Sequence, residues 1–273
     1  MTLPPYLYKY EPFSAQSLQN LKNQVIHFGS PLNFNDPYDC AISPRIKNMT
    51  DAEVERVRRY YLENPKLEEK KRIQIKMASL TALREMLLCI GQNLLNEKIQ
   101  EFLRYRGVSC FSEKKDSLLM WSHYSDHCKG FCLEFSTSSE LFQKIRKVCY
   151  MKEMPEIDIV SMFCDKDFDA VINDLYCTKA IEWAYEHEWR GIHNKVGTEY
   201  TYLSAALTGI YFGPDMPHAA LEIIALILAG QNEHIQLWQG SRSKSNFSVE
   251  FRPVAYTPHL EAKRKGLLEN KDV

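Results

Sequence analysis

The chain has 273 residues, of which 45% are hydrophobic and 25% charged, and its formal net charge is −1. A chain of this size can bury enough surface to fold without a metal or a disulfide. The balanced charge argues against strong non-specific binding to a nucleic-acid backbone, which needs an excess of Lys and Arg.

The N-terminal residues lack the pattern of a signal peptide, and the longest apolar run, residues 223–229, is far too short to cross a bilayer. The eight cysteines are scattered, mostly in apolar stretches. This usage is typical of reduced thiols. We therefore expect a cytoplasmic protein with no membrane partner.

The chain begins with a predicted strand–helix–strand segment. Residues 7–10 and 25–28 are short apolar runs typical of strands, and Ser14 can cap a helix between them. A turn is expected at residues 34–37, because Asn and Asp bond the backbone ahead and Pro fixes φ.

A helical insertion is predicted over about residues 50–106. Thr50 and Glu53 have the spacing of a capping box, which begins a highly charged helical stretch. Breaks are expected near Pro65 and Gly91.

The second half alternates predicted strands and helices. Expected strands occupy residues 107–112, 130–135, 209–213, 235–238 and 247–251. Expected helices occupy residues 117–124, 141–148 (after a capping box of Thr137 and Glu140), 168–180 and 218–229. The pattern predicts a single α+β domain over residues 1–273, with a mixed or antiparallel central sheet, flanking helices and a polar, frayed tail over about 258–273.

Two acids lie close together in the segment Trp183-Ala184-Tyr185-Glu186-His187-Glu188-Trp189-Arg190. As a strand, it would place Glu186, Glu188 and Arg190 on one face, with the carboxylates about 7 Å apart. Such a pair can separate into one ionised group and one with a raised pKa. As a helix, Glu186 and Arg190 would instead form an ion pair.

Residues 34–39 supply an amide and two acids in a short loop. We interpret Asn35, Asp36 and Asp39 as shaping the mouth of a functional pocket; the alternative is a rigid turn held by Asx bonds.

A zinc site is not expected. His123, His127, Cys128 and Cys132 do not match a standard finger spacing, and Cys132 lies in an apolar strand.

Several motifs in fixed order resemble a bacterial family known as domain of unknown function 2971. They are Leu7-Tyr8-Lys9-Tyr10, Phe34-Asn35-Asp36-Pro37-Tyr38-Asp39, Cys110-Phe111-Ser112-Glu113, Met120-Trp121-Ser122-His123-Tyr124, Gly130-Phe131-Cys132-Leu133-Glu134-Phe135, Glu186-His187-Glu188-Trp189-Arg190 and Ile210-Tyr211-Phe212-Gly213-Pro214. The resemblance spans about residues 6–255. Some relatives are regarded as accessory or phage-defence genes, which is consistent with a toxin-like enzyme.

The order of Lys9, Ser112 and Glu186-x-Glu188 also resembles ADP-ribosyltransferases of the Arg-Ser-Glu type. This resemblance implies an NAD-consuming site, either a transferase or an NAD glycohydrolase, with a macromolecular acceptor left open. Glu188 would be the principal catalytic acid, with Glu186 beside it, stabilising an oxocarbenium-like centre. The implied cofactor-binding residues are Tyr8, Lys9, Ser112, Trp121, His123, Tyr124 and Arg190.

Two other functions remain open from the sequence. A metal-dependent nuclease or hydrolase could use Asp36, Asp39, Glu186 and Glu188 as oxygen ligands for magnesium. A non-enzymatic ligand-sensing module could line its pocket with Trp121, Tyr124 and Trp189.

Overall fold

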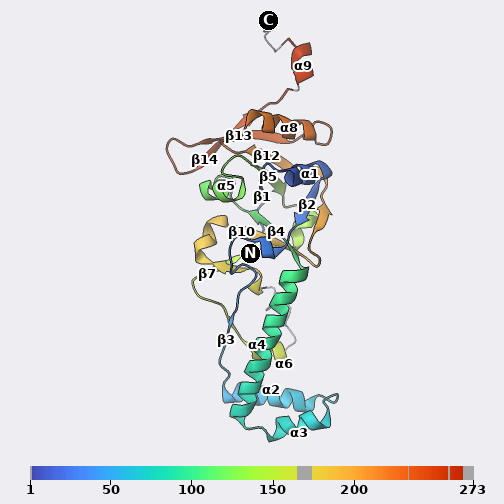
Figure 1. The fold of residues 1–273 in the computed structure, drawn as a ribbon, viewed down its shortest axis with the longest axis vertical. Helices are drawn as coiled ribbons and strands as arrows, with labels where there is room; N and C mark the ends of the chain where they lie inside the picture. The colour runs from blue at the N-terminus through green and yellow to red at the C-terminus, as the bar shows by residue number, and fades with distance from the viewer. Residues whose placement is uncertain (1, 165–173, 233, 258, 267–273) are drawn as a thin grey trace.

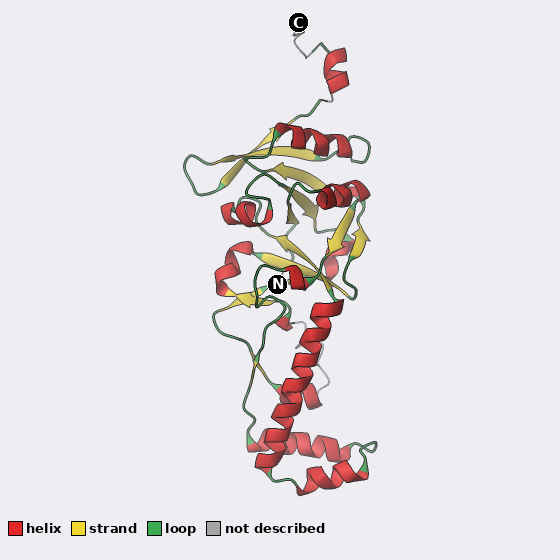
Figure 2. Ribbon diagram, viewed as in Figure 1, coloured by secondary structure: helices red, strands yellow, loops and turns green. Residues whose placement is uncertain are grey.

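The computed structural model describes residues 2–164, 174–232, 234–257 and 259–266 (Figure 1). Within these residues the chain has an α+β fold. A large mixed sheet forms the body, helices cover parts of both faces, and a helical arm extends from one end (Figure 2). None of the described helices has the length and apolar character needed to span a membrane.

The central sheet has eight strands in the order β14-β13-β12-β5-β1-β4-β10-β6. β12 and β13 are parallel, and the other neighbouring pairs are antiparallel, which confirms the expected class of sheet. The strands are β1 (Tyr6–Glu11), β4 (Gly107–Ser112), β5 (Phe131–Ser136), β6 (Arg146–Lys147), β10 (Glu188–His193), β12 (Leu207–Phe212), β13 (Gln236–Arg242) and β14 (Val249–Val254).

Short strand pairs and short 3₁₀ helices surround this sheet. The pairs are β2 (Val25–Phe28) with β11 (Thr198–Thr201), β3 (Arg45–Ile46) with β8 (Glu156–Ile157), and β7 (Cys149–Met151) with β9 (Thr178–Ala180). The 3₁₀ helices are η1 (Pro31–Asn33), η2 (Glu140–Lys144), η3 (Ile181–Glu186) and η4 (Ser204–Ala206).

Alternation along the strands gives the sheet two different faces. One face packs Leu7, Leu133 and Ile210 against α1 (Ala15–Asn23) and α8 (His218–Leu228). α1 begins at its expected cap, because Ser14 accepts a hydrogen bond from the Ser17 amide. The other face carries an aromatic cluster that includes Trp121 of α5 (Leu118–Tyr124).

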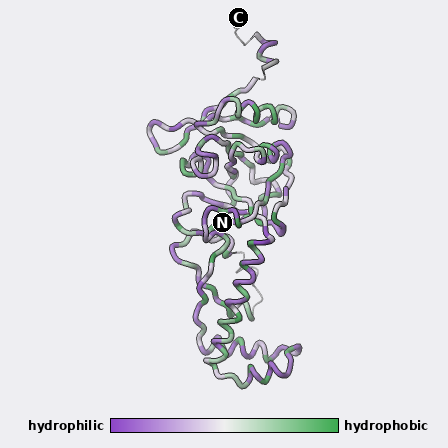
Figure 3. The backbone as a smooth tube through the Cα atoms, in the orientation of Figure 1, coloured by the Kyte–Doolittle hydropathy of each residue, from purple (hydrophilic) through white to green (hydrophobic). Residues whose placement is uncertain are grey.

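The helical arm contains α2 (Asp51–Glu63), α3 (Glu69–Met77) and α4 (Leu80–Tyr105), with α6 (Ile159–Cys164) beside it. Thr50 and Glu53 form the expected capping box at the start of α2. α4 is continuous, so the break expected at Gly91 was wrong. A Cβ at Gly91 would lie 3.0 Å from Ile159, so this glycine permits close packing of α6. Figure 3 shows that α2 and α3 are largely hydrophilic, whereas α8 is mainly hydrophobic.

Three further expectations differ from the structure. The helix expected at 141–148 is replaced by η2 and the edge strand β6, which pairs with β10. Much of the helix expected at 168–180 lies outside the described residues, and its last three residues form β9. Part of the tail expected to fray forms α9 (His259–Arg264), and its residues 258 and 267–273 lie outside the described residues.

Candidate functional site

A cavity of about 510 Å³ opens where two neighbouring strands of the sheet separate. β1 pairs with β5 along its whole length but with β4 only at Tyr8 and Ser112. Farther along β4, Val108 pairs instead with Gly29, which follows β2. The space between these strands is lined by residues from α1, β2, the loop after η1, and α5. Its volume falls in the range of small-molecule sites.

Arg190, on β10 behind one wall of the cavity, is a fully buried clamp. Its guanidinium donates to both oxygens of Glu188, with Nε–Oε1 and Nη2–Oε2 distances of 2.6 and 2.8 Å. It also donates to both oxygens of Asp39, at 2.6 and 2.8 Å, and to the Tyr176 carbonyl at 2.9 Å. All three guanidinium nitrogens are therefore engaged inside the protein.

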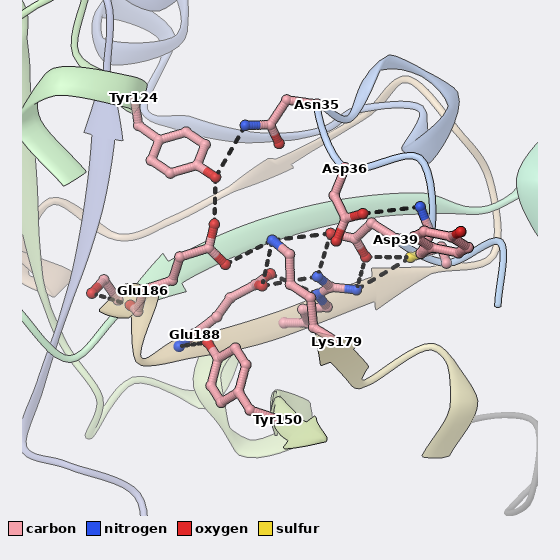
Figure 4. Close-up of polar contacts among 12 residues, drawn as sticks. Asn35, Asp36, Asp39, Tyr124, Tyr150, Lys179, Glu186 and Glu188 are labelled. Carbon is pink, nitrogen blue, oxygen red and sulfur yellow. Dashed lines mark hydrogen bonds and ion pairs between the residues drawn. The ribbon is translucent and has the colours of Figure 1, made fainter. Parts of the chain in front are cut away.

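Lys179, on β9, links three acids around the same cavity (Figure 4). Its Nζ lies 2.7 Å from Glu186 Oε2, 3.2 Å from Asp39 Oδ2 and 3.7 Å from Glu188 Oε2. The ammonium also lies 4.6 Å from the ring centroid of Trp183. We call Asp39, Lys179, Glu186, Glu188 and Arg190 the acid–cation cluster.

A left-handed turn brings Glu186 to the cluster from the end of η3. His187 has φ 45°, and its neighbours Glu186 and Glu188 are both buried at the cavity wall. The Ser112 hydroxyl fixes this turn by donating to the Glu186 carbonyl at 2.6 Å. The Tyr124 hydroxyl donates to Glu186 Oε1, and Asn35 donates to Tyr124 at 3.5 Å.

The two neighbouring glutamates have opposite pKa shifts. Burial and the charge of Glu188 raise the pKa of Glu186 from 4.5 to about 7, although Lys179 opposes the change. Burial also acts to raise the pKa of Glu188, but Arg190 outweighs it and lowers that pKa to about 2. Burial acts to lower the pKa of Lys179, but Glu188 and Asp39 reverse this effect, so the pKa is raised. Of the two carboxyl groups, Glu188 is therefore the more readily ionised and Glu186 the more readily protonated.

Most of the residues predicted from the sequence meet at this cavity. The lining includes Tyr8, Lys9, Asn35, Asp39, Ser112, His123, Tyr124, Glu186 and Glu188. Lys9 Nζ lies 3.5 Å from Glu11 Oε1. Ser112 is fully buried, and its hydroxyl is engaged by the Glu186 carbonyl.

Three predicted residues do not line the cavity. Trp121 is fully buried in the aromatic cluster, where its indole donates to the Lys115 carbonyl. Arg190 was expected to contact a cofactor, but its guanidinium is buried and engaged by Glu188 and Asp39. Asp36 instead accepts a hydrogen bond from the Tyr38 amide at 2.9 Å, in the Asx turn that the sequence allowed.

The segment 183–190 is neither a continuous strand nor a helix. Residues 181–186 form η3, and β10 begins at Glu188. Trp189 packs into the core on the opposite face from Glu188 and Arg190, as a strand requires.

The sequence did not predict two residues of the site, Lys179 and Tyr150. Lys179 belongs to a region where a helix was expected, and a single Lys after Thr178 carries no signal of a site. Tyr150, on β7, accepts a hydrogen bond from the Glu188 amide at 2.9 Å.

The histidine and cysteine side chains considered for zinc do not come together at one place. His123 lines the cavity, whereas Cys128 and Cys132 are buried in the aromatic cluster. Across the described ranges, no group of three or more His, Cys, Asp or Glu side chains is arranged to hold a metal ion.

The fold and site define an α+β protein with a cavity walled by buried acids and cations. The model of a family described as "Protein of unknown function (DUF2971)" matches residues 120–191, which supports the resemblance to that family. The matched segment contains Tyr124, Lys179, Glu186, Glu188 and Arg190. No curated protein and no solved structure matches the chain.

Proposed function

We propose that the cavity is the active site of an enzyme that consumes NAD by cleaving its nicotinamide–ribose bond. The proposal depends on one observation: two buried carboxylates at the cavity wall are held by different partners. Arg190 clamps both oxygens of Glu188. Lys179 and Tyr124 hold Glu186, and this difference gives the two acids opposite pKa shifts. Pairs of acids separated in this way commonly divide catalytic roles between them.

Glu188 is the residue suited to stabilise positive charge. Arg190 holds it ionised and rigid on β10, and Tyr150 fixes its backbone amide. As nicotinamide leaves with the electrons of the C–N bond, the ribose develops oxocarbenium character. A fixed carboxylate at the cavity wall stabilises that charge without reorganising.

Glu186 is the residue suited to move a proton. Its pKa of about 7 leaves a substantial ionised fraction at neutral pH. It removes the proton from the attacking water or acceptor hydroxyl as the new bond to ribose forms. Nicotinamide, the ADP-ribosyl product and one proton are released. Tyr124 and Lys179 hold the two oxygens of Glu186 during this step.

The remaining walls suit a nucleotide. Tyr8, Tyr10 and Phe34 offer aromatic surface for a base, and Lys9 offers a cation. Consumption of a shared cofactor would suit a toxin-like or phage-defence effector.

The other two functions have less support from this geometry. A magnesium ion would have to displace Lys179 and Arg190 from carboxylates that they already hold. Of the three residues expected to line a sensing pocket, Tyr124 lines the cavity. Trp121 and Trp189 lie in hydrophobic clusters away from the cavity lining, so this function is less favoured.

The test is a nicotinamide-release assay with purified protein and NAD. Wild-type protein should release nicotinamide, and Glu188→Gln should reduce the rate at least about 100-fold while leaving the fold intact. Glu113→Gln is the matched control, because Glu113 pairs with Lys147 and Trp189 outside the cavity lining. Wild-type protein that neither binds nor consumes NAD would contradict the proposal.

A further inference from the structure

The charges around the cavity do not balance. In the described part of the chain, the charged side chains in the lining are Lys9, Glu11, Asp39, Lys179, Glu186 and Glu188. Arg190 adds a cation directly behind them. Four carboxylates thus face three cations, and the wall has one excess negative charge when every group is ionised.

The excess lies at the Lys179 end of the cavity. Lys9 and Glu11 form their own pair at 3.5 Å, which leaves Asp39, Glu186 and Glu188 to share Lys179 and Arg190.

Aromatic side chains stand beside this excess charge. Tyr124 contacts Glu186 directly, and Phe34 and His123 line the same cavity. The faces of aromatic rings attract cations, and a buried carboxylate attracts them more strongly as water is excluded. A neutral ring would gain the stacking on these aromatic side chains but not the attraction to the carboxylates.

We propose that the cavity selects a cationic heteroaromatic ring over its neutral counterpart, and that entry of the ring releases the proton held by the Glu186 end of the cluster. The inference deepens the proposed function and rests on the same cavity, because the nicotinamide ring of oxidised NAD is a pyridinium cation. The dihydro form of the ring is neutral and should bind less well.

The coupling to a proton follows from the groups around Glu186. Burial and Glu188 on β10 favour its protonated form, whereas Lys179 on β9 favours the ionised form. Asp39, in the loop, shares the Lys179 ammonium with Glu186. From α5, Tyr124 donates to Glu186, and His123 lies in the cavity lining nearby. A ligand cation acts in the same direction as Lys179, so it favours proton release.

A matched pair of small rings tests the inference without any turnover. Calorimetric titration compares 1-methylnicotinamide, which is a cation, with neutral nicotinamide at pH 8 and pH 6. We expect the cation to bind at least about tenfold more tightly at pH 8. At pH 6, titrations in buffers of different ionisation enthalpy should show release of a proton upon binding.

Glu186→Gln removes the excess charge and should abolish the preference, whereas Glu113→Gln should keep it. If Glu186→Gln does not fold, the wild-type comparison still decides, because the preference must weaken from pH 8 to pH 6. Equal affinities at pH 8, binding of neither ring, or no proton release at pH 6 would overturn the inference. If the protein prefers the cation but releases no nicotinamide, the inference about ring selection stands and the enzyme proposal fails. If it releases nicotinamide without preferring the cation, the enzyme proposal stands and the inference fails.

Discussion

Lys179 lies 2.7 Å from Glu186 and is 4% exposed, so its charge is compensated almost entirely by buried acids. Lys179→Met would leave Glu186 and Asp39 without this cation in a low-dielectric wall. Breaking such a buried pair costs about 3–5 kcal/mol, which should appear as a lower free energy of unfolding in denaturant titrations.

Lys147→Met is the control for that variant. Lys147 also pairs with a glutamate at 2.7 Å, but both side chains are partly exposed. We expect a loss of less than about 1 kcal/mol. Similar losses of unfolding free energy for both variants would show that the buried ion pairs of Lys179 contribute no more to stability than the partly exposed pair of Lys147.

Stability should depend on pH through Glu186. Its folded pKa of about 7 exceeds the ordinary 4.5, so the native state binds this proton more tightly than the unfolded state does. The resulting stabilisation is fully present below about pH 4.5 and is lost as pH rises through 7, by up to about 3 kcal/mol. Unfolding measured from pH 4.5 to 8 should show this decline, and Glu186→Gln should flatten it.

Glu188 acts in the opposite direction at acidic pH. Its folded pKa of about 2 lies below the ordinary 4.5, so its stabilisation is present above pH 4.5 and is lost as pH falls toward 2. Glu188→Gln should therefore reduce the sensitivity of the protein to acid. A steeper acid transition in this variant would contradict the ion pair with Arg190.

Two neighbours in the loop should separate binding from stability. Asn35 lines the cavity and reaches Tyr124, so Asn35→Ala should raise KM with little change in unfolding. Asp36 closes the turn, so Asp36→Ala should lower stability by about 1 kcal/mol. If Asp36→Ala raised KM and Asn35→Ala did not, the assignment of Asn35 to the mouth of the cavity would be wrong.

Local signals predicted most of the fold. Ser14 and the Thr50–Glu53 pair cap helices where expected, because capping depends on residues only three positions apart. The helix expected at 141–148 does not form, because Arg146 and Lys147 pair with β10 at the edge of the sheet, an interaction that no short segment contains. Gly91 did not break α4, because tertiary packing on Ile159 outweighed its low helix propensity.

The site was only partly predictable for the same reason. Glu186 and Glu188 were visible as acids two residues apart. Lys179 was not, because its contact with Asp39 joins residues 140 positions apart and has no periodic signature. Strand alternation placed Arg190 on the same face as Glu188, but it could not show that Arg190 also binds Asp39, since that depends on which loop covers β10.

The protonation of Glu186 can be measured directly by NMR titration of ¹³C-labelled glutamate carboxyl groups, with Glu186→Gln used to assign the signal. We expect one carboxyl signal to titrate near pH 7 and to disappear in that variant. A Glu186 signal that titrates near the ordinary value of 4.5 would contradict the division of roles between Glu186 and Glu188.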